Sequence, residues 1–286
     1  MALLKLSKSS ISKGLPKYPS AAVSSTLPGE TSSLVSPLEY SPAVWLDSQD
    51  ISTLTLASNR VSQWNDKSGN GINFTQGDGA RQPLYEASSA MNNKPSIYFD
   101  TFTCMDKSAF NLFNTSSSPV TMFFVTRQLQ TASQNFYFTW NVATSPGCQN
   151  TEVGYYDDST PGGVGYSHGI HRGCSQGIKT SQQTYTATEV GVFQIKSSGS
   201  APNHVIYRSG GQPQTVLTSY TNVSYPSPGS YITIAGTMRL GGRKDSDGSG
   251  FDSKYMGHIG EVIIYKSELT TSQIKDVEKY LFSRWY

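Results

Sequence analysis

Residues 257–286, GHIGEVIIYKSELTTSQIKDVEKYLFSRWY, predict a buried strand followed by an amphipathic helix. Thr270 and Gln273 have the spacing of a capping box, which marks the start of the helix. Four apolar residues then recur on one helical face: Ile274, Val277, Leu281 and Trp285. That face needs an apolar partner, so we expect the helix to cover an edge or an end of the structure that the preceding strand reaches.

The rest of the chain has the composition of a β protein. Its 286 residues include 17 Tyr, 12 Phe and 26 Gly, and only 15% are charged. Aromatic residues suit strands, whereas Gly, Ser and Asn suit turns, and NDKSGNG (65–71) predicts a tight loop because its residues tolerate positive φ. Short apolar runs such as PAVWLD (42–47) and PVTMFFVTRQ (119–128) alternate with turn residues. We therefore predict an all-β fold, a two-sheet sandwich of the jelly-roll type with a C-terminal helix.

Residues 1–41 are expected to form an extended N-terminal arm, and residues 42–286 a single domain. The first forty residues contain ten Ser and four Pro and have little apolar periodicity. They are either a disordered tail or an arm that anchors the protein to a partner. In the second interpretation, small apolar side chains and lysines bind an apolar, acidic groove on the partner. The anchoring residues are then Leu3, Leu4, Lys5, Leu6, Lys8, Ile11, Lys13 and Lys17.

Charge and cysteine content exclude several classes of protein. A formal net charge of +2 does not indicate nucleic-acid binding, and no run of eighteen apolar residues predicts membrane insertion. Lys5 and Lys8 interrupt the apolar start, so no secretory signal peptide is expected. Cys104, Cys148 and Cys174 lack the spacing of a zinc site and are expected to be free thiols, although Cys148 and Cys174 could pair in an oxidising compartment.

Two short segments contain potential metal ligands. Asp245, Asp247 and Asp252 in KDSDGSGFD offer hard oxygen ligands suited to calcium, although a polar hairpin loop explains the same residues. His168 and His171 lie near Cys174, but one short cluster in a loop does not predict a transition-metal site. No cofactor is expected beyond this possible calcium ion.

A cluster of aromatic and acidic residues is the candidate for sugar binding. Aromatic faces stack on sugar rings while carboxylates bind hydroxyl groups. The candidate residues share a Gly-rich region, and they are Tyr155, Tyr156, Asp157, Asp158 and Tyr166. Tyrosines that only pack a loop are the alternative.

Several segments resemble a known group of domains. PAVWLDSQDISTLTLASNRVSQWNDKSGNGINFTQ (42–76), RQPLYE (81–86), NNKPSIYFD (92–100) and the closing stretch look like the LamG-like branch of the concanavalin A-like lectin/glucanase domains. The resemblance covers about a third of the chain and implies a jelly-roll β-sandwich. It implies no single activity, because this fold includes lectins, glycosidases, adhesion modules and virion proteins.

The glucanases that the chain resembles carry the pattern ExDxxE on one strand, which brings their catalytic carboxylates together. This pattern is absent here. Glu152, Asp157 and Asp158 form the nearest acidic cluster, and they are interpreted as a solvated loop. We therefore expect no catalytic residues and no enzymatic activity.

The functional expectation follows from two facts that conflict. The fold usually occurs in proteins that work outside cells, but the chain shows no export signal. The resemblance includes phage capsid-decoration, head-fibre and tail proteins. We therefore expect a structural protein on the virion surface of a tailed bacteriophage, homo-oligomeric, bound to other virion proteins and able to bind host surface glycans. Whether it would lie on the capsid or the tail stays open. A secreted or surface adhesin is the alternative, and a glycoside hydrolase is the third.

Overall fold

The computed structural model describes residues 34–100, 102–112, 118–129, 135–141, 151–157, 166–172, 177–179, 187–196, 203–209, 216–217, 236–244 and 251–286. Leu34–Tyr286 form one compact unit, and Met1–Ser33 are assigned to a second. The predicted anchoring residues all belong to Met1–Ser33 and lie outside the described residues. The role of the arm therefore stays a prediction.

The described part consists mainly of antiparallel strands, which confirms the all-β prediction. The helical elements are η1 (Pro37–Tyr40), η2 (Ile51–Thr53), η3 (Gly79–Arg81) and α1 (Thr271–Trp285). The strands are β1 (Val44–Asp47), β2 (Leu54–Ala57), β3 (Arg60–Trp64), β4 (Phe74–Thr75), β5 (Leu84–Glu86), β6 (Ser96–Phe99), β7 (Met105–Phe110), β8 (Val120–Gln128), β9 (Asn135–Asn141), β10 (Thr151–Asp157), β11 (Tyr166–Arg172), β12 (Gly177–Lys179), β13 (Glu189–Lys196), β14 (Asn203–Ser209), β15 (Val216–Leu217), β16 (Gly236–Leu240), β17 (Gly242–Lys244), β18 (Phe251–Lys254) and β19 (Gly257–Tyr265).

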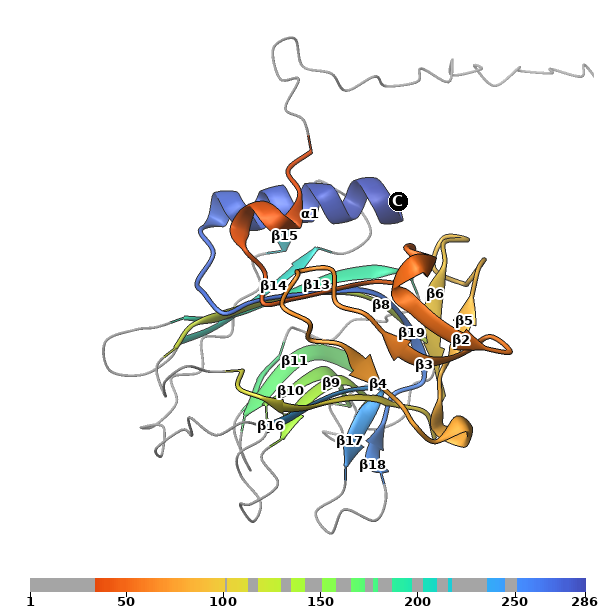
Figure 1. Ribbon diagram of the computed structural model, residues 1–286. Coiled ribbons are helices and arrows are strands. Elements are labelled where there is room, and N and C mark those ends of the chain that lie inside the picture. Colours follow the sequence, from red (N-terminus) through yellow and green to blue (C-terminus); the bar gives the residue numbers. More distant parts are fainter. Residues whose placement is uncertain are drawn as a thin grey trace, which may run out of the picture. The chain divides into compact units, whose positions relative to one another are not determined.

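Strand pairing joins seventeen of these strands into one sheet that folds over into two layers (Figure 1). The layer beneath α1, here called the helix-side layer, contains β1, β19, β8, β13 and β14 in hydrogen-bonded order. The opposite layer, here called the far layer, contains β7, β16, β9, β10 and β11. The short strands β3 to β6 connect the two layers.

The central strand β8 is covered on both of its faces by apolar cores. Met122 and Phe124 contribute to the core between the two layers, whereas Phe123 and Val125 contribute to a second core beneath α1. Successive side chains of a strand point to opposite faces. The run MFFV (122–125) is therefore apolar throughout because both faces of this strand are covered.

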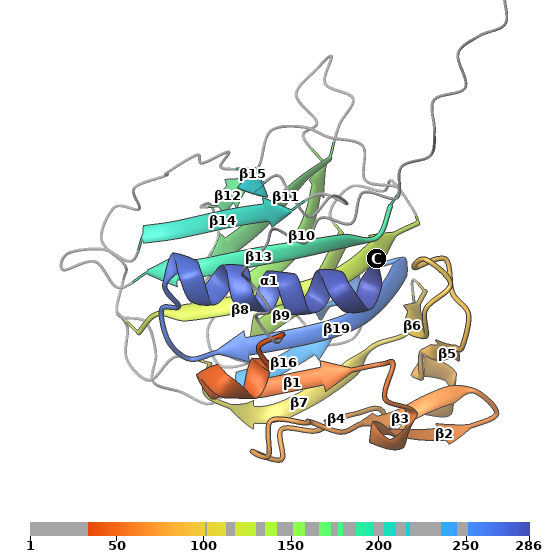
Figure 2. The same ribbon diagram turned by 90° about the horizontal axis from the view of Figure 1, so that it is seen from above.

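The closing helix forms as its sequence predicts. The Thr270 hydroxyl accepts from the Gln273 backbone N–H, and the Gln273 side chain accepts from the Thr270 backbone N–H, which is a complete capping box. The predicted apolar residues Ile274, Val277, Leu281 and Trp285 are all buried in the second core. However, α1 covers the broad face of the helix-side layer, over β8 and β19, instead of an edge (Figure 2).

The end of α1 fits closely against a glycine of β19. A Cβ atom at Gly260 would lie 2.2 Å from the Trp285 indole, which is too close for any side chain. The β19 strand also has a register irregularity between Ile259 and Glu261, beside this glycine. The absence of a side chain at Gly260 thus lets the Trp285 indole pack directly against the backbone of β19, and the Trp285 side chain is fully buried.

Candidate functional site

Two buried carboxyl groups lie side by side beneath the end of α1. Asp47 of β1 and Glu261 of β19 are directly opposite each other in the strand register, and both are 0% exposed. Arg284 of α1 bridges them, because its Nη2 lies 2.8 Å from both Asp47 carboxylate oxygens and its Nε lies 3.6 Å from Glu261 Oε2. Lys67 Nζ also lies 2.9 Å from Asp47 Oδ2.

The environments of the two carboxyl groups differ. Burial raises the pKa of Glu261 to about 7, and the nearby Asp47 carboxylate adds to this rise. The Arg284 guanidinium and the indole N–H groups of Trp285 and Trp45 act in the opposite direction. A carboxylate beside a carboxyl of raised pKa is the usual chemistry of a general acid and its partner.

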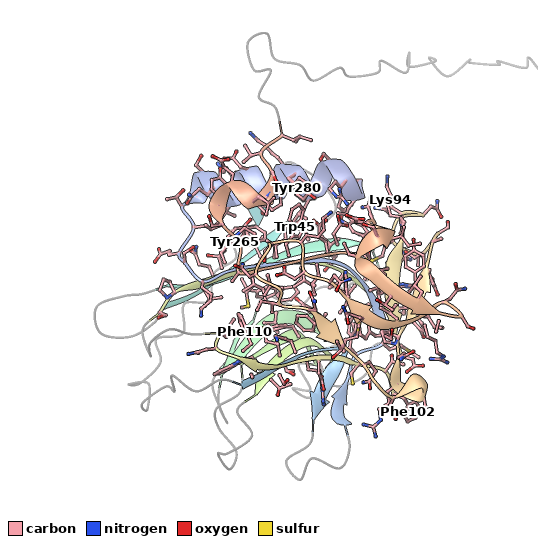
Figure 3. The ribbon with its side chains drawn as sticks, viewed as in Figure 1. Trp45, Lys94, Phe102, Phe110, Tyr265 and Tyr280 are labelled. Atoms are coloured by element: carbon pink, nitrogen blue, oxygen red, sulfur yellow. The ribbon has the colours of Figure 1, made fainter. Side chains whose placement is uncertain are left out.

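This pair is nevertheless closed to a substrate. Trp45 Nε1 donates to Glu261 Oε1 and Trp285 Nε1 donates to Glu261 Oε2, each at 2.8 Å. Figure 3 shows Trp45, Tyr265 and Tyr280 between the helix and the sheet. With both oxygens of Glu261 bonded and no solvent exposure, the pair joins α1 to the sheet and does not serve as an active site.

The outer face of the far layer carries a different set of polar residues. In the strand register, Asp106 of β7 lies opposite Arg239 of β16, and Arg239 lies opposite Thr139 of β9. Thr139 lies opposite Glu152 of β10, which in turn lies opposite His171 of β11. These five residues form a straight row across the layer, here called the polar row.

Strand alternation places the polar row on the face that points away from the core. The adjacent row contains Leu240, Phe138 and Val153, which are 0% exposed and belong to the core between the layers. Their neighbours in each strand must therefore lie on the opposite face. The polar row therefore runs along the face of the far layer that points away from the core, where Asp106 is partly exposed, Arg239 is only 11% exposed and Thr139 is buried.

One end of the polar row is held by a bidentate ion pair. Arg239 Nε and Nη2 lie 2.6 Å from the two carboxylate oxygens of Asp106, and the Asp106 side chain is 32% exposed. Thr139 is buried, and its hydroxyl donates to the Gly242 carbonyl at 3.2 Å. Positions Glu152 and His171 continue the row into β10 and β11.

The predicted sugar-binding residues fall on a hairpin, and not in a loop. Tyr155, Tyr156 and Asp157 belong to β10, and Tyr166 belongs to β11, whereas Asp158 lies outside the described residues. Alternation along β10 and β11 assigns the positions of Tyr155, Asp157 and Tyr166 to the same face as Val153. The position of Tyr156 belongs to the opposite face, with that of Glu152. This separation could not be predicted, because the register of the two strands cannot be read from the amino-acid sequence.

The predicted metal ligands and thiols are only partly described. Asp245, Asp247, Cys148 and Cys174 lie outside the described residues, Asp252 belongs to β18, and His168 and His171 belong to β11. Within the described ranges, no three His, Cys, Asp or Glu side chains are grouped to hold a metal ion. Cys104 is buried as a free thiol, and burial raises its pKa to about 11.

A pocket of about 560 Å³ lies at the ends of β7 and β19, where η1 leads into β1. The loop after β3 forms one side of it, and Asp66 shapes this loop by accepting the backbone N–H groups of Trp45, Ser68 and Ile72. This is the tight loop that NDKSGNG predicts, with positive φ at Gly69 and Gly71. Sequence analysis did not single out Lys266, which lines the opposite side of the pocket.

The described part contains no helix that is both long and apolar enough to cross a membrane.

Comparisons with known proteins identify the class of structure. No family model matches the chain, and no curated protein matches it in sequence. Among solved structures, it is similar to a GH54 α-L-arabinofuranosidase soaked with a cyclic sulfate inhibitor, with a TM-score of 0.63 and 12% identity over 88% of this chain and 66% of that one. The fold is thus one that glycoside hydrolases adopt.

Two further structures extend this likeness. An arabinofuranosidase complexed with arabinofuranosyl-α-1,2-xylobiose matches with a TM-score of 0.58 and 14% identity over 86% of this chain and 59% of that one. A sialidase of Trypanosoma rangeli matches with a TM-score of 0.53 and 10% identity over 90% of this chain and 36% of that one. The chain therefore spans about 60% of the length of the arabinofuranosidases that it matches. At sequence identities this low, the likeness establishes the fold alone.

These comparisons contradict the prediction of a non-enzymatic virion protein. The similar structures are glycoside hydrolases, and nothing in the comparisons supports a virion or bacteriophage assignment. The expectation of no enzymatic activity depended on the missing ExDxxE pattern. That pattern tests only for carboxylates on one strand, whereas a sheet can bring polar residues together from neighbouring strands, as the polar row shows.

Proposed function

We propose that this chain is a glycoside hydrolase that binds its glycan against the outer face of the far layer. The observation that carries the proposal is the likeness of 88% of the chain to an α-L-arabinofuranosidase with a TM-score of 0.63. The polar row supports it, because strand alternation assigns these positions to the face of the far layer that is opposite the core and α1.

Glu152 is the proposed catalytic carboxyl group of the polar row. Hydrolysis of a glycosidic bond uses two carboxyl groups about 5 to 9.5 Å apart, one of which protonates the leaving oxygen. Asp106 and Glu152 are three strand spacings apart, or about 14 Å between their backbones, so the carboxyl group that works with Glu152 must come from outside the polar row. Asp106 is also bound to Arg239, whereas Glu152 is opposite an uncharged Thr139 and a histidine.

The same proposal includes the finer fold type. A jelly-roll sandwich of the concanavalin A-like kind agrees with the pairing of the first and last strands of the domain, in which Val44 lies opposite Ile264. The closing stretch, which resembles LamG-like domains, supplies the strand of that pair and the helix α1.

The test is the release of 4-nitrophenol from 4-nitrophenyl glycosides, including the α-L-arabinofuranoside, and of reducing sugar from arabinan and arabinoxylan. We expect turnover by the wild-type protein and a fall in kcat of at least about 100-fold in Glu152→Gln, because a positioned acid or base contributes that much.

Glu39→Gln is the matched control, since it makes the same change at an exposed carboxylate of η1, outside the polar row. Its kcat should stay close to that of the wild-type protein. No turnover on any of these substrates, or equal losses in the two variants, would contradict the proposal.

A further inference from the structure

The pocket at the ends of β7 and β19 combines one cation with apolar walls and uncharged polar groups. Leu38, Ile72 and Phe110 supply apolar surface, and Ser41 and Asn70 supply a hydroxyl and an amide. Its volume of about 560 Å³ lies within the usual range for sites that bind small molecules. None of the described residues that line it is acidic.

Among the described residues that line the pocket, Lys266 alone is charged, and the fold positions it there. It follows Tyr265 at the end of β19, and its Nζ donates to the Asn111 carbonyl at 2.7 Å. The same Nζ lies 5.5 Å from the centre of the Phe110 ring, which is 8% exposed. These two contacts use one N–H and fix the direction of the side chain, so two N–H groups stay available for an anion.

The ammonium group has no counter-ion in the part of the chain that the structure describes. The described ion pairs involve other residues, and burial alone lowers the pKa of Lys266. Asp66 belongs to the loop that lines the pocket, but its two oxygens accept three backbone N–H groups and the Ser68 hydroxyl. A partly desolvated cation without a partner attracts an anion more strongly than a fully solvated one.

Two polar groups beside Lys266 are free to bind hydroxyl groups. The Asn70 amide nitrogen donates to the carbonyls of Pro42 and Ala43, which leaves the amide oxygen directed elsewhere and without a donor among the described residues. The Ser41 side chain likewise has no hydrogen bond within these ranges, because Ser41 caps η1 through its backbone N–H alone. Both residues are exposed.

From this arrangement we propose that the pocket binds an acidic sugar, whose carboxylate pairs with Lys266 and whose ring hydroxyls bind Ser41 and Asn70. Phe110 and Ile72 provide apolar surface for the carbon face of the ring, as aromatic and aliphatic side chains do in sugar sites. This site is separate from the polar row and needs no hydrolytic activity, so a binding measurement tests it alone.

The experiment titrates the full chain with D-galacturonate, its methyl ester, D-galactose and acetate, and follows binding by calorimetry or ligand-observed NMR. We expect D-galacturonate to bind at least fivefold more tightly than the ester, which lacks the charge, and than acetate, which lacks the ring. D-galactose should bind as weakly as the ester. Because these comparisons change only the ligand, they do not depend on any variant folding.

Lys266→Met should remove the preference for D-galacturonate, and Lys275→Met, at an exposed position of α1, should keep it. The thermal transition of each variant shows whether it is folded. The proposal is wrong if D-galacturonate does not bind, if the ester binds equally well, if acetate competes equally, or if a folded Lys266→Met keeps the preference.

Discussion

The helix-side layer and the far layer each carry acidic and basic residues in strand register, but the two sets have opposite environments. Asp47 and Glu261 in the helix-side layer are 0% exposed because α1 lies over them, whereas the Asp106 side chain in the far layer is 32% exposed. The first set joins the helix to the sheet, whereas the second includes a carboxylate that solvent reaches. Coverage by α1 therefore decides which carboxylates of the two layers are sealed from solvent.

Weakening the packing of α1 on the sheet should have the largest effect on the free energy of unfolding. Trp285→Ala removes a fully buried indole and leaves Glu261 Oε2 without its donor, so we expect a loss of about 3 to 5 kcal/mol in the free energy of unfolding. Urea unfolding followed by circular dichroism measures this loss. Ile51→Ala, at a side chain that is 56% exposed, should change it by less than about 0.5 kcal/mol. Equal midpoints for the two variants would mean that α1 is not integral to the fold.

The buried pair should also make stability depend on pH. The pKa of Glu261 rises from an ordinary value of 4.5 to about 7 on folding, so the folded protein holds its proton more tightly than the unfolded chain. The stabilisation is full below pH 4.5 and is lost as the pH rises to about 7, by on the order of 3 kcal/mol.

Unfolding free energies from urea titrations at several pH values between 4.5 and 7 test this slope. Glu261→Gln has no titrating group at this position, so its stability should fall less steeply over the same interval. Identical slopes for the wild-type protein and Glu261→Gln would show that this carboxyl does not titrate there. The Asp106 ion pair of the far layer is partly exposed and should contribute little in this range.

The contact between Gly260 and Trp285 provides the smallest of these tests. Gly260→Ala places a methyl group within 2.2 Å of the indole, and we expect a cost of about 1 to 3 kcal/mol as α1 shifts. Gly77→Ala is its control, because nothing lies within 4 Å of a Cβ atom there and its φ is not positive. Thermal unfolding of both variants should therefore separate them, and a neutral Gly260→Ala would mean that the helix end is loosely packed.

Much of the helix-side layer could be predicted from local sequence. The capping box at Thr270 and Gln273 identified the helix start, and the apolar spacing identified the face that is buried. The loop NDKSGNG was predicted from residues that tolerate positive φ. In each case the signal lies within a few residues of chain, where backbone propensity and side-chain periodicity act directly.

The candidate site could not be predicted in the same way. Asp106, Thr139, Glu152, His171 and Arg239 are far apart in the sequence, and only strand register brings them into one row. Glu152 was considered as a catalytic residue and rejected, because its neighbours in sequence did not match a one-strand motif. The hairpin of β10 and β11 was interpreted as a loop because its Gly and Tyr content suits both.

The amino-acid sequence alone is enough to predict that the chain is mostly β, that residues 271–285 form a capped helix, and which residues of that helix are buried. The three-dimensional structure was needed to show that α1 lies on the face of the sheet, that Asp47 and Glu261 are inaccessible beneath it, and that Lys266 lines a pocket with Ser41 and Asn70. The physical reason is that helix and turn formation depend on neighbours in the chain. Burial and charge pairing depend on which distant segments meet, and here β1 and β19 pair across more than two hundred residues.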